Sequence, residues 1–107
     1  MLVSFAPRFA IYGDALCREL RRARPGLRVQ VAPPTEAAEA AERLGPHLVV
    51  SDGPVRAPGA AKARISADPT EPSTMRLKGE VRRVVNPTFD DLLAFVDEVA
   101  GSVGGSR

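Results

Sequence analysis

The fold is decided by the run PHLVVSD at residues 46–52. Its middle is an almost uninterrupted series of aliphatic side chains, which is typical of a strand buried on both faces of a parallel sheet. Gly45 and Pro46 break any helix before it, and Asp52 follows directly after it. We therefore predict a central parallel strand at residues 47–51 that presents a carboxylate at its C-terminal end.

The chain before this strand alternates between strand and helix patterns. Residues 1–6 are a short apolar run ended by a proline, and residues 27–31 alternate apolar with polar side chains, which is typical of an edge strand. Apolar residues recur at helical spacing over residues 9–24, and residues 36–44 predict a second helix with Thr35 as its N-cap. This order, with short connections, predicts right-handed crossovers between parallel strands.

The second half of the chain is less regular. Prolines and glycines in residues 53–62 leave room for a loop only, so the third crossover is shortened. A fourth strand is expected at residues 63–67. Residues 74–78 and 80–85 then flank Gly79 as the two arms of a β-hairpin. This hairpin takes the place of the fourth helix that a regular series of strand–helix–strand units would have.

The last helix has the clearest signals. Thr88 is its predicted N-cap, Asp91 completes a short capping box, and apolar residues form one face over residues 89–100 before Gly101 ends it. The resulting fold class is α/β. We expect a three-layer, flavodoxin-like open sheet that is mainly parallel.

The composition is that of one cytoplasmic domain. A chain of 107 residues suffices for one core, and its 44% apolar and 26% charged residues differ from the composition of disordered chains. No apolar run approaches the ~20 residues that span a bilayer, and no signal peptide pattern opens the chain. We expect one domain at residues 1–101, a disordered tail at residues 102–107, and no membrane contact.

Three short motifs fall at the ends of predicted strands: residues 46–52 end in Asp52, Ser66 ends the fourth strand, and Asn86-Pro87 precedes the last helix. In this order they resemble the receiver domains of bacterial response regulators. In that family the aspartate is the phosphoacceptor, a Ser or Thr contacts the phosphoryl group, and a Lys-Pro pair follows the fifth strand. The resemblance covers nearly the whole chain in the order of its elements.

The chain departs from receivers where their chemistry is done. Receivers carry an acidic pair for Mg²⁺ after the first strand, whereas residues 5–8 read FAPR, and Asn86 replaces the lysine. Because Mg²⁺ needs oxygen ligands and phosphoryl transfer depends on neutralising charge, the resemblance implies a degenerate receiver, or pseudo-receiver. We expect no enzyme activity, no metal site and no cofactor. Cys17 is expected to be buried, and His47 to lie at a strand edge.

Our leading hypothesis is a non-catalytic, phosphorylation-independent protein-interaction or regulatory module that binds a protein partner or a second copy of itself. One alternative is a residual phosphoacceptor or anion binder that uses Asp52, although an Asp before Gly-Pro also starts turns by bonding its own backbone. A second alternative is an Arg-rich nucleic-acid-binding domain. The candidate interaction surface consists of Arg18, Arg21, Arg22, Arg76, Lys78, Arg82 and Arg83.

Overall fold

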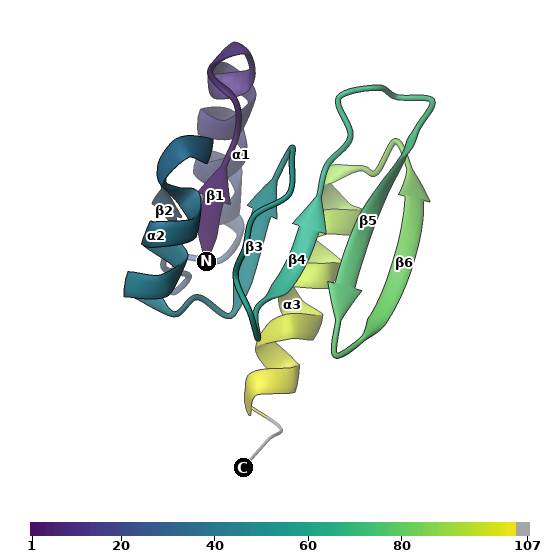
Figure 1. Ribbon diagram of the computed structural model, residues 1–107. Helices are drawn as coiled ribbons and strands as arrows, with labels where there is room; N and C mark the ends of the chain where they lie inside the picture. The colour runs from purple at the N-terminus through teal and green to yellow at the C-terminus, as the bar shows by residue number, and fades with distance from the viewer. Residues whose placement is uncertain (105–107) are drawn as a thin grey trace.

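A computed structural model describes residues 1–104 as a six-stranded mixed sheet with three α-helices (Figure 1). The strand order is β2-β1-β3-β4-β5-β6. The elements are β1 (Leu2–Ser4), the 3₁₀ turn η1 (Pro7–Phe9), α1 (Ala10–Ala23), β2 (Gln30–Val31), α2 (Pro34–Leu44), β3 (Leu48–Ser51), β4 (Ala61–Arg64), β5 (Pro72–Leu77), β6 (Glu80–Val85) and α3 (Phe89–Gly104).

The prediction of a flavodoxin-like, mainly parallel sheet is wrong. The strands β2, β1, β3 and β4 pair in parallel, but β5 pairs antiparallel to both β4 and β6, so the C-terminal end of the sheet is antiparallel. Chain length explains the change of direction. Residues 65–71 form a shorter connection than residues 52–60, which join the parallel strands β3 and β4 and are already fewer than the dozen or so usual for a parallel crossover.

The predicted hairpin around Gly79 is confirmed. Residues Lys78 and Gly79 form a two-residue turn between β5 and β6, with φ angles of 51° and 82°. Positive φ at both central positions gives a turn whose twist matches that of the flanking strands. The loop expected in the third crossover is also present, between β3 and β4.

Several predicted boundaries differ from the observed ones. The strand expected at residues 63–67 is β4 at Ala61–Arg64, and the edge strand expected at residues 27–31 is shortened to β2. Helix α2 begins at Pro34, so Thr35 lies inside its first turn and is not its N-cap. Helix α3 runs through Gly101, where we predicted its end, because one glycine costs a helix only about 1 kcal/mol. The rest of the predicted tail, residues 105–107, lies outside the described residues.

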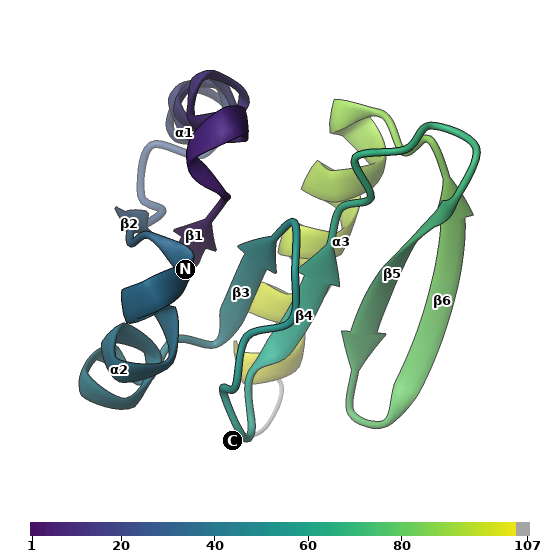
Figure 2. The same cartoon turned by 45° about the horizontal axis from the view of Figure 1, so that its top comes forward.

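The helices divide unequally between the two faces of the sheet. Helices α1 and α3 cover one face, where Leu20 and Phe95 pack with Val3 and Val50. Helix α2 covers part of the other face through small residues such as Ala40, in a second cluster that includes Leu2, Val49 and Ala57. Figures 1 and 2 show α2 beside β1 and β2, while no helix lies in front of β4, β5 and β6.

Helix α3 is fixed at its start and along its length. The Thr88 amide donates to Asp91 Oδ2 (2.9 Å) and the Asp91 amide donates to Thr88 Oγ1 (3.1 Å), so the predicted capping box is confirmed. Arg24, just after α1, donates to both carboxylate oxygens of Asp97 (2.8 and 2.6 Å). Arg82 of β6 likewise donates hydrogen bonds to both carboxylate oxygens of Glu98. These contacts join α3 to the C-terminal end of α1 and to the edge strand β6.

Candidate functional site

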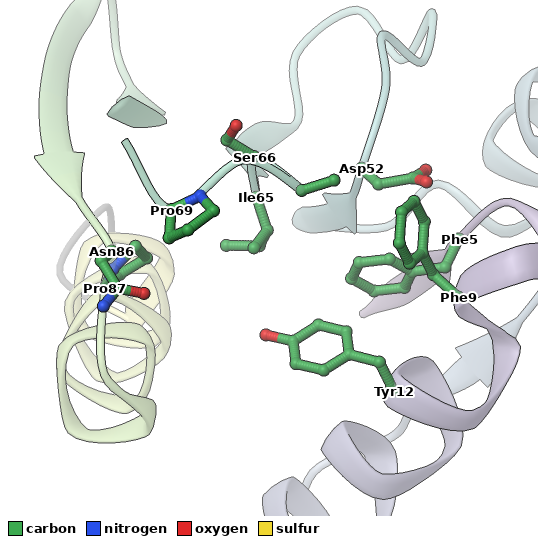
Figure 3. Close-up of a pocket in the computed structure, with 10 residues that line it drawn as sticks. Phe5, Phe9, Tyr12, Asp52, Ile65, Ser66, Pro69, Asn86 and Pro87 are labelled. Carbon is green, nitrogen blue, oxygen red and sulfur yellow. The ribbon is translucent and has the colours of Figure 1, made fainter. Parts of the chain in front are cut away.

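A cleft of about 330 Å³ opens at the edge of the sheet where β1, β3 and β4 end (Figure 3). Strand β6 runs parallel to β4, so its C-terminal end reaches the same edge. Open α/β sheets commonly bind ligands at such an edge. The lining residues are Phe5, Phe9, Tyr12, Asp52, Ile65, Ser66, Ala67, Pro69, Asn86 and Pro87.

The positions singled out by sequence meet in this cleft. Asp52 follows β3, Ser66 lies just after β4, and Asn86 with Pro87 connects β6 to α3. The structure thus brings residues far apart in sequence to one surface, which the sequence had left open. Their chemistry is a separate question, which depends on what each side chain contacts.

Asp52 is held by the backbone that follows β1. The Ala6 amide lies 3.3 Å from Asp52 Oδ1 and 3.2 Å from Oδ2 and donates to the carboxylate. The local turn is made instead by Ser51, whose hydroxyl donates to the Gly53 carbonyl at 2.6 Å. In Figure 3 the Asp52 carboxylate points toward the segment that carries Phe5. Asp52 thus links the ends of β1 and β3.

Aromatic side chains form one wall of the cleft. Phe5 directly follows β1, Phe9 lies in η1 and Tyr12 lies in the first turn of α1. The rings of Phe5 and Tyr12 meet edge to face, with centroids 5.3 Å apart, and burial raises the pKa of the Tyr12 phenol. Gly13 permits this packing because a Cβ there would lie 3.1 Å from Phe5 Cδ2.

Sequence reasoning missed this aromatic wall. Its signal was available, because three of the five aromatic residues, Phe5, Phe9 and Tyr12, lie within the first twelve positions. The spacing across a strand end, a 3₁₀ turn and a helix start matches neither a helical nor a strand period. Only the bend of the chain at η1 brings the three rings to one side.

The other polar groups of the cleft are committed to local structure. The Ser66 hydroxyl donates to the Asp68 carbonyl (3.1 Å) and accepts from the Asp68 amide (3.2 Å). Asp68 itself accepts from the Thr70 amide and hydroxyl, which lowers its pKa. Asn86 adopts a left-handed backbone conformation with φ of 48°. Ser66 and Asn86 therefore shape the loops around the cleft.

The cleft holds little that could stabilise a phosphoryl group. Asp52 is the single carboxylate in its described lining, which also contains no Lys or Arg. Across residues 1–104 no three His, Cys, Asp or Glu side chains are grouped to hold a metal ion. The segment after β1, where receivers carry their acidic pair, supplies Ala6 and Pro7 instead.

The cationic residues of the candidate interaction surface do not form one patch. Arg21 donates to the Val29 carbonyl (3.0 Å), and Arg22 lies 3.7 Å from Glu19. Arg18 belongs to the same helix, α1, whereas the remaining four belong to the hairpin at the other end of the sheet. Within the hairpin, Arg82 is bound to Glu98 of α3. The hairpin residues outside that contact are Arg76, Lys78 and Arg83.

Two residues considered for chemistry have simple surroundings. Cys17 is buried in the core beneath α1, and burial raises the pKa of its thiol, which favours the unreactive protonated form. His47 is exposed at the start of β3. Neither residue lines the cleft.

Comparisons with protein-family models, curated proteins and solved structures found no match. The relation to receivers therefore stays a prediction that rests on residues 46–52, 65–67 and 86–87. No helix in the described chain is long and apolar enough to cross a membrane.

Proposed function

We propose that this chain is a non-catalytic protein-interaction or regulatory module of the cytoplasm that works without phosphorylation. One observation carries the proposal: Asp52 is bound to the Ala6 amide beside an aromatic wall, and the described lining of this cleft has no second carboxylate and no cation. Asp52 also borders a separate hollow with Arg64, Asp68 and Glu71, but Asp68 there is bound to Thr70. A degenerate receiver ancestry is compatible with this function and forms part of the proposal.

Phosphorylation of Asp52 would need groups that this cleft does not supply. A carboxylate oxygen would attack phosphorus, and the charge on the phosphoryl oxygens would have to be neutralised by a metal ion or by cations. Phe5, Phe9 and Tyr12 line the cleft beside Asp52 instead of such cations or metal ligands. Aromatic faces repel rather than bind a phosphoryl anion, because their quadrupole is negative at the face.

Neither alternative function has comparable support. An anion-binding role for Asp52 would place a negative group beside an existing carboxylate. Nucleic-acid binding through α1 is weakened because Arg21 and Arg22 already contact groups within the molecule. The interaction role is favoured by exposed apolar side chains on α1, where Ile11 is 87% and Tyr12 47% exposed.

Treatment with acetyl phosphate and Mg²⁺, followed by intact-mass measurement, tests the proposal. We expect no phosphoryl adduct on the wild-type chain, and the same result for Asp52→Asn. An adduct that forms on the wild type and is absent from Asp52→Asn would show that Asp52 is a phosphoacceptor and would overturn the proposed function.

A further inference from the structure

The face of β4, β5 and β6 opposite α3 carries a group of cations. Strand register places Lys62, Arg76 and Val81 directly opposite one another, and likewise Arg64, Thr74 and Arg83. Opposed residues point to the same side of a sheet. Their sequence neighbours Ala63 and Met75 are buried in the core on the other side. We call this surface the open sheet face; it comprises Lys62, Arg64, Arg76, Arg83, Val81 and Val85.

Its charge is not balanced within the fold. None of the four cations forms an ion pair with any described residue. Arg64 shares a hollow with Asp52, Asp68 and Glu71, so the excess positive charge is concentrated at Lys62, Arg76 and Arg83. Lys62 and Arg76 are directly opposed, an arrangement that is destabilising for like charges. A carboxylate placed between them would relieve this repulsion.

The same face offers apolar contact. Val81 is 43% exposed and Val85 61% exposed, both on β6. No aromatic side chain belongs to the open sheet face, although aromatic rings are what sheets use to stack the bases of single-stranded nucleic acid. Because the open sheet face combines valines with arginines and has no aromatic ring, its expected binding partner is a protein surface that carries carboxylates, and not a nucleic acid.

Helix α2 presents such a surface. Ala37, Ala40 and Ala41 face the sheet of their own chain, and Glu39 and Glu42 are exposed on the outer side of the helix. Residues three apart lie on the same side of a helix. Arg56 lines a hollow with these two glutamates but forms no ion pair with them in the described chain.

Helix α2 and the open sheet face lie on the same side of the sheet. Val49 packs in the cluster under α2, and its partner in the register is Lys62 of the open sheet face. Figure 2 shows α2 beside β1 and β2 and the loop that joins β3 to β4 next to it, while β5 and β6 carry no described helix on this side. Helix α2 therefore stands above the uncovered strands by the thickness of one helix, about 10–12 Å with side chains.

We infer that a second copy of this chain covers the open sheet face, in a two-fold dimer in which each α2 fills the half-layer that the other chain leaves empty. Glu39 and Glu42 of each copy meet Arg76 and Arg83 of the other, and Arg–carboxylate pairs of this kind bond through two parallel contacts. The two contacts are equivalent, as a two-fold axis requires. The inference rests on the proposed interaction function and names the partner.

An arginine–carboxylate pair of the kind proposed for the dimer is already present within the chain. On the opposite side of the hairpin, Arg82 of β6 binds Glu98 of α3 through two nitrogens. Pairing between β6 edge strands is a poorer route to a dimer. Antiparallel pairing centred on Arg82 or on Arg83 would bring that arginine opposite the same arginine of the other copy, and like charges there repel.

Sedimentation velocity on the full chain tests the dimer. We expect a reversible monomer–dimer equilibrium at about 0.05 M NaCl, with a Kd that rises at least about tenfold at about 0.5 M NaCl as the charges are screened. A chain that stays monomeric at about 200 µM in low salt would overturn the inference. That result would leave the proposed function standing, because the latter is tested by the phosphodonor experiment.

A charge exchange makes the test specific. Glu39→Lys/Glu42→Lys and Arg76→Glu/Arg83→Glu should each be monomeric, because each places like charges at both contacts of its own dimer. Mixed together, the two variants should form a heterodimer, since both contacts then become complementary. The mixture also controls for folding, because a misfolded variant would not restore association.

The matched control is Arg18→Glu/Arg22→Glu, which reverses two exposed cations of α1 on the other side of the sheet. It should dimerise with the wild-type Kd. A dimer that persists in Arg76→Glu/Arg83→Glu would mean a different interface. A wild-type chain that stays monomeric but binds a poly-uridine oligonucleotide through these arginines would assign the face to nucleic acid. Either result overturns the inference.

Discussion

At the scale of single residues, the role of Asp52 is set by one contact. Its sequence position, at the end of a buried strand and before Gly-Pro, fits a phosphoacceptor but favours a turn starter. In the structure its carboxylate accepts from the Ala6 amide, at the point where the chain leaves β1 for η1. Asp52 is therefore a link between two strand ends, and its loss should be felt in stability.

We expect Asp52→Ala to lower the free energy of unfolding by about 1–2 kcal/mol, because the half-buried Ala6 amide loses its acceptor. Asp52→Asn should lose less, since the amide oxygen of asparagine can still accept. Urea unfolding followed by circular dichroism measures both. Equal stability of wild type and Asp52→Ala would show that solvent satisfies the Ala6 amide.

Asn86 is a second residue whose backbone decides what can replace it. With φ of 48° it lies in the left-handed region, which asparagine and glycine tolerate better than other residues. We expect Asn86→Ala to cost about 1 kcal/mol and Asn86→Gly to change stability by less than about half of that. Asn86→Lys, which introduces the residue that receivers carry before the proline, should cost as much as Asn86→Ala. Thermal unfolding of the three variants provides the comparison.

At the scale of elements, the starts of helices α3 and α2 show how much neighbouring residues alone can predict. The start of α3 was predicted from spacing because a capping box involves residues only three apart, and its two hydrogen bonds are present. The start of α2 was predicted two residues too late, because Pro34 fits the first helical position and takes it.

This difference makes a matched pair of variants. Thr88→Ala removes the hydroxyl that accepts from the Asp91 amide and should destabilise the chain by about 1 kcal/mol. Thr35→Ala lies inside the first turn of α2, where alanine is the better helix former, so we expect no loss of stability. The midpoints of urea unfolding, compared at a common m value, give the two changes in stability. Equal losses would contradict the helix starts described above.

The turn of the hairpin can be improved. Lys78 has φ of 51°, which is unfavourable for lysine and acceptable for asparagine, and Gly79 follows it with φ of 82°. We expect Lys78→Asn to stabilise the chain by about 0.5 kcal/mol and Gly79→Ala to destabilise it by about 1 kcal/mol. A Gly79→Ala variant as stable as the wild type would rule out the positive φ at this position.

At the scale of the whole molecule, exposed ion pairs join α3 to the end of α1 and to the edge strand β6. Arg24 contacts Asp97 and Arg82 contacts Glu98. The hydrogen bond from each arginine, followed by its charge, lowers the pKa of the carboxyl group it contacts. A carboxyl group whose pKa is lower in the folded than in the unfolded state stabilises the fold above its unfolded pKa, and this contribution disappears as pH falls through the folded pKa.

Thermal melts between about pH 3 and pH 7 should therefore show a fall in Tm in the acid range, beginning near the ordinary carboxyl pKa of about 4. In Glu98→Gln this fall should be shallower, because the variant has no charge to lose at that position. Glu36→Gln, on α2 and without an ion pair in the described chain, should follow the wild type. A Glu98→Gln curve parallel to the wild type would exclude a role for the pair in acid stability.

The sequence by itself determined the elements. The apolar run at residues 47–51, the helical spacing over residues 9–24 and the turn at Gly79 each act within a few positions, so their patterns predicted β3, α1 and the hairpin. Whether Asp52, Ser66 and Asn86 converge on one edge was left open by the sequence, because it depends on the directions of β4 and β6 in the sheet.

Tertiary structure decided the rest. The direction of β5 depends on how far residues 65–71 can reach, and the flavodoxin-like prediction was wrong for that reason. The partner of the Asp52 carboxylate, the aromatic wall from Phe5 to Tyr12 and the uncovered face over β4 to β6 all join residues distant in sequence or faces without a repeating pattern. Such features depend on packing between elements, and a periodic pattern records only which side of one element is buried.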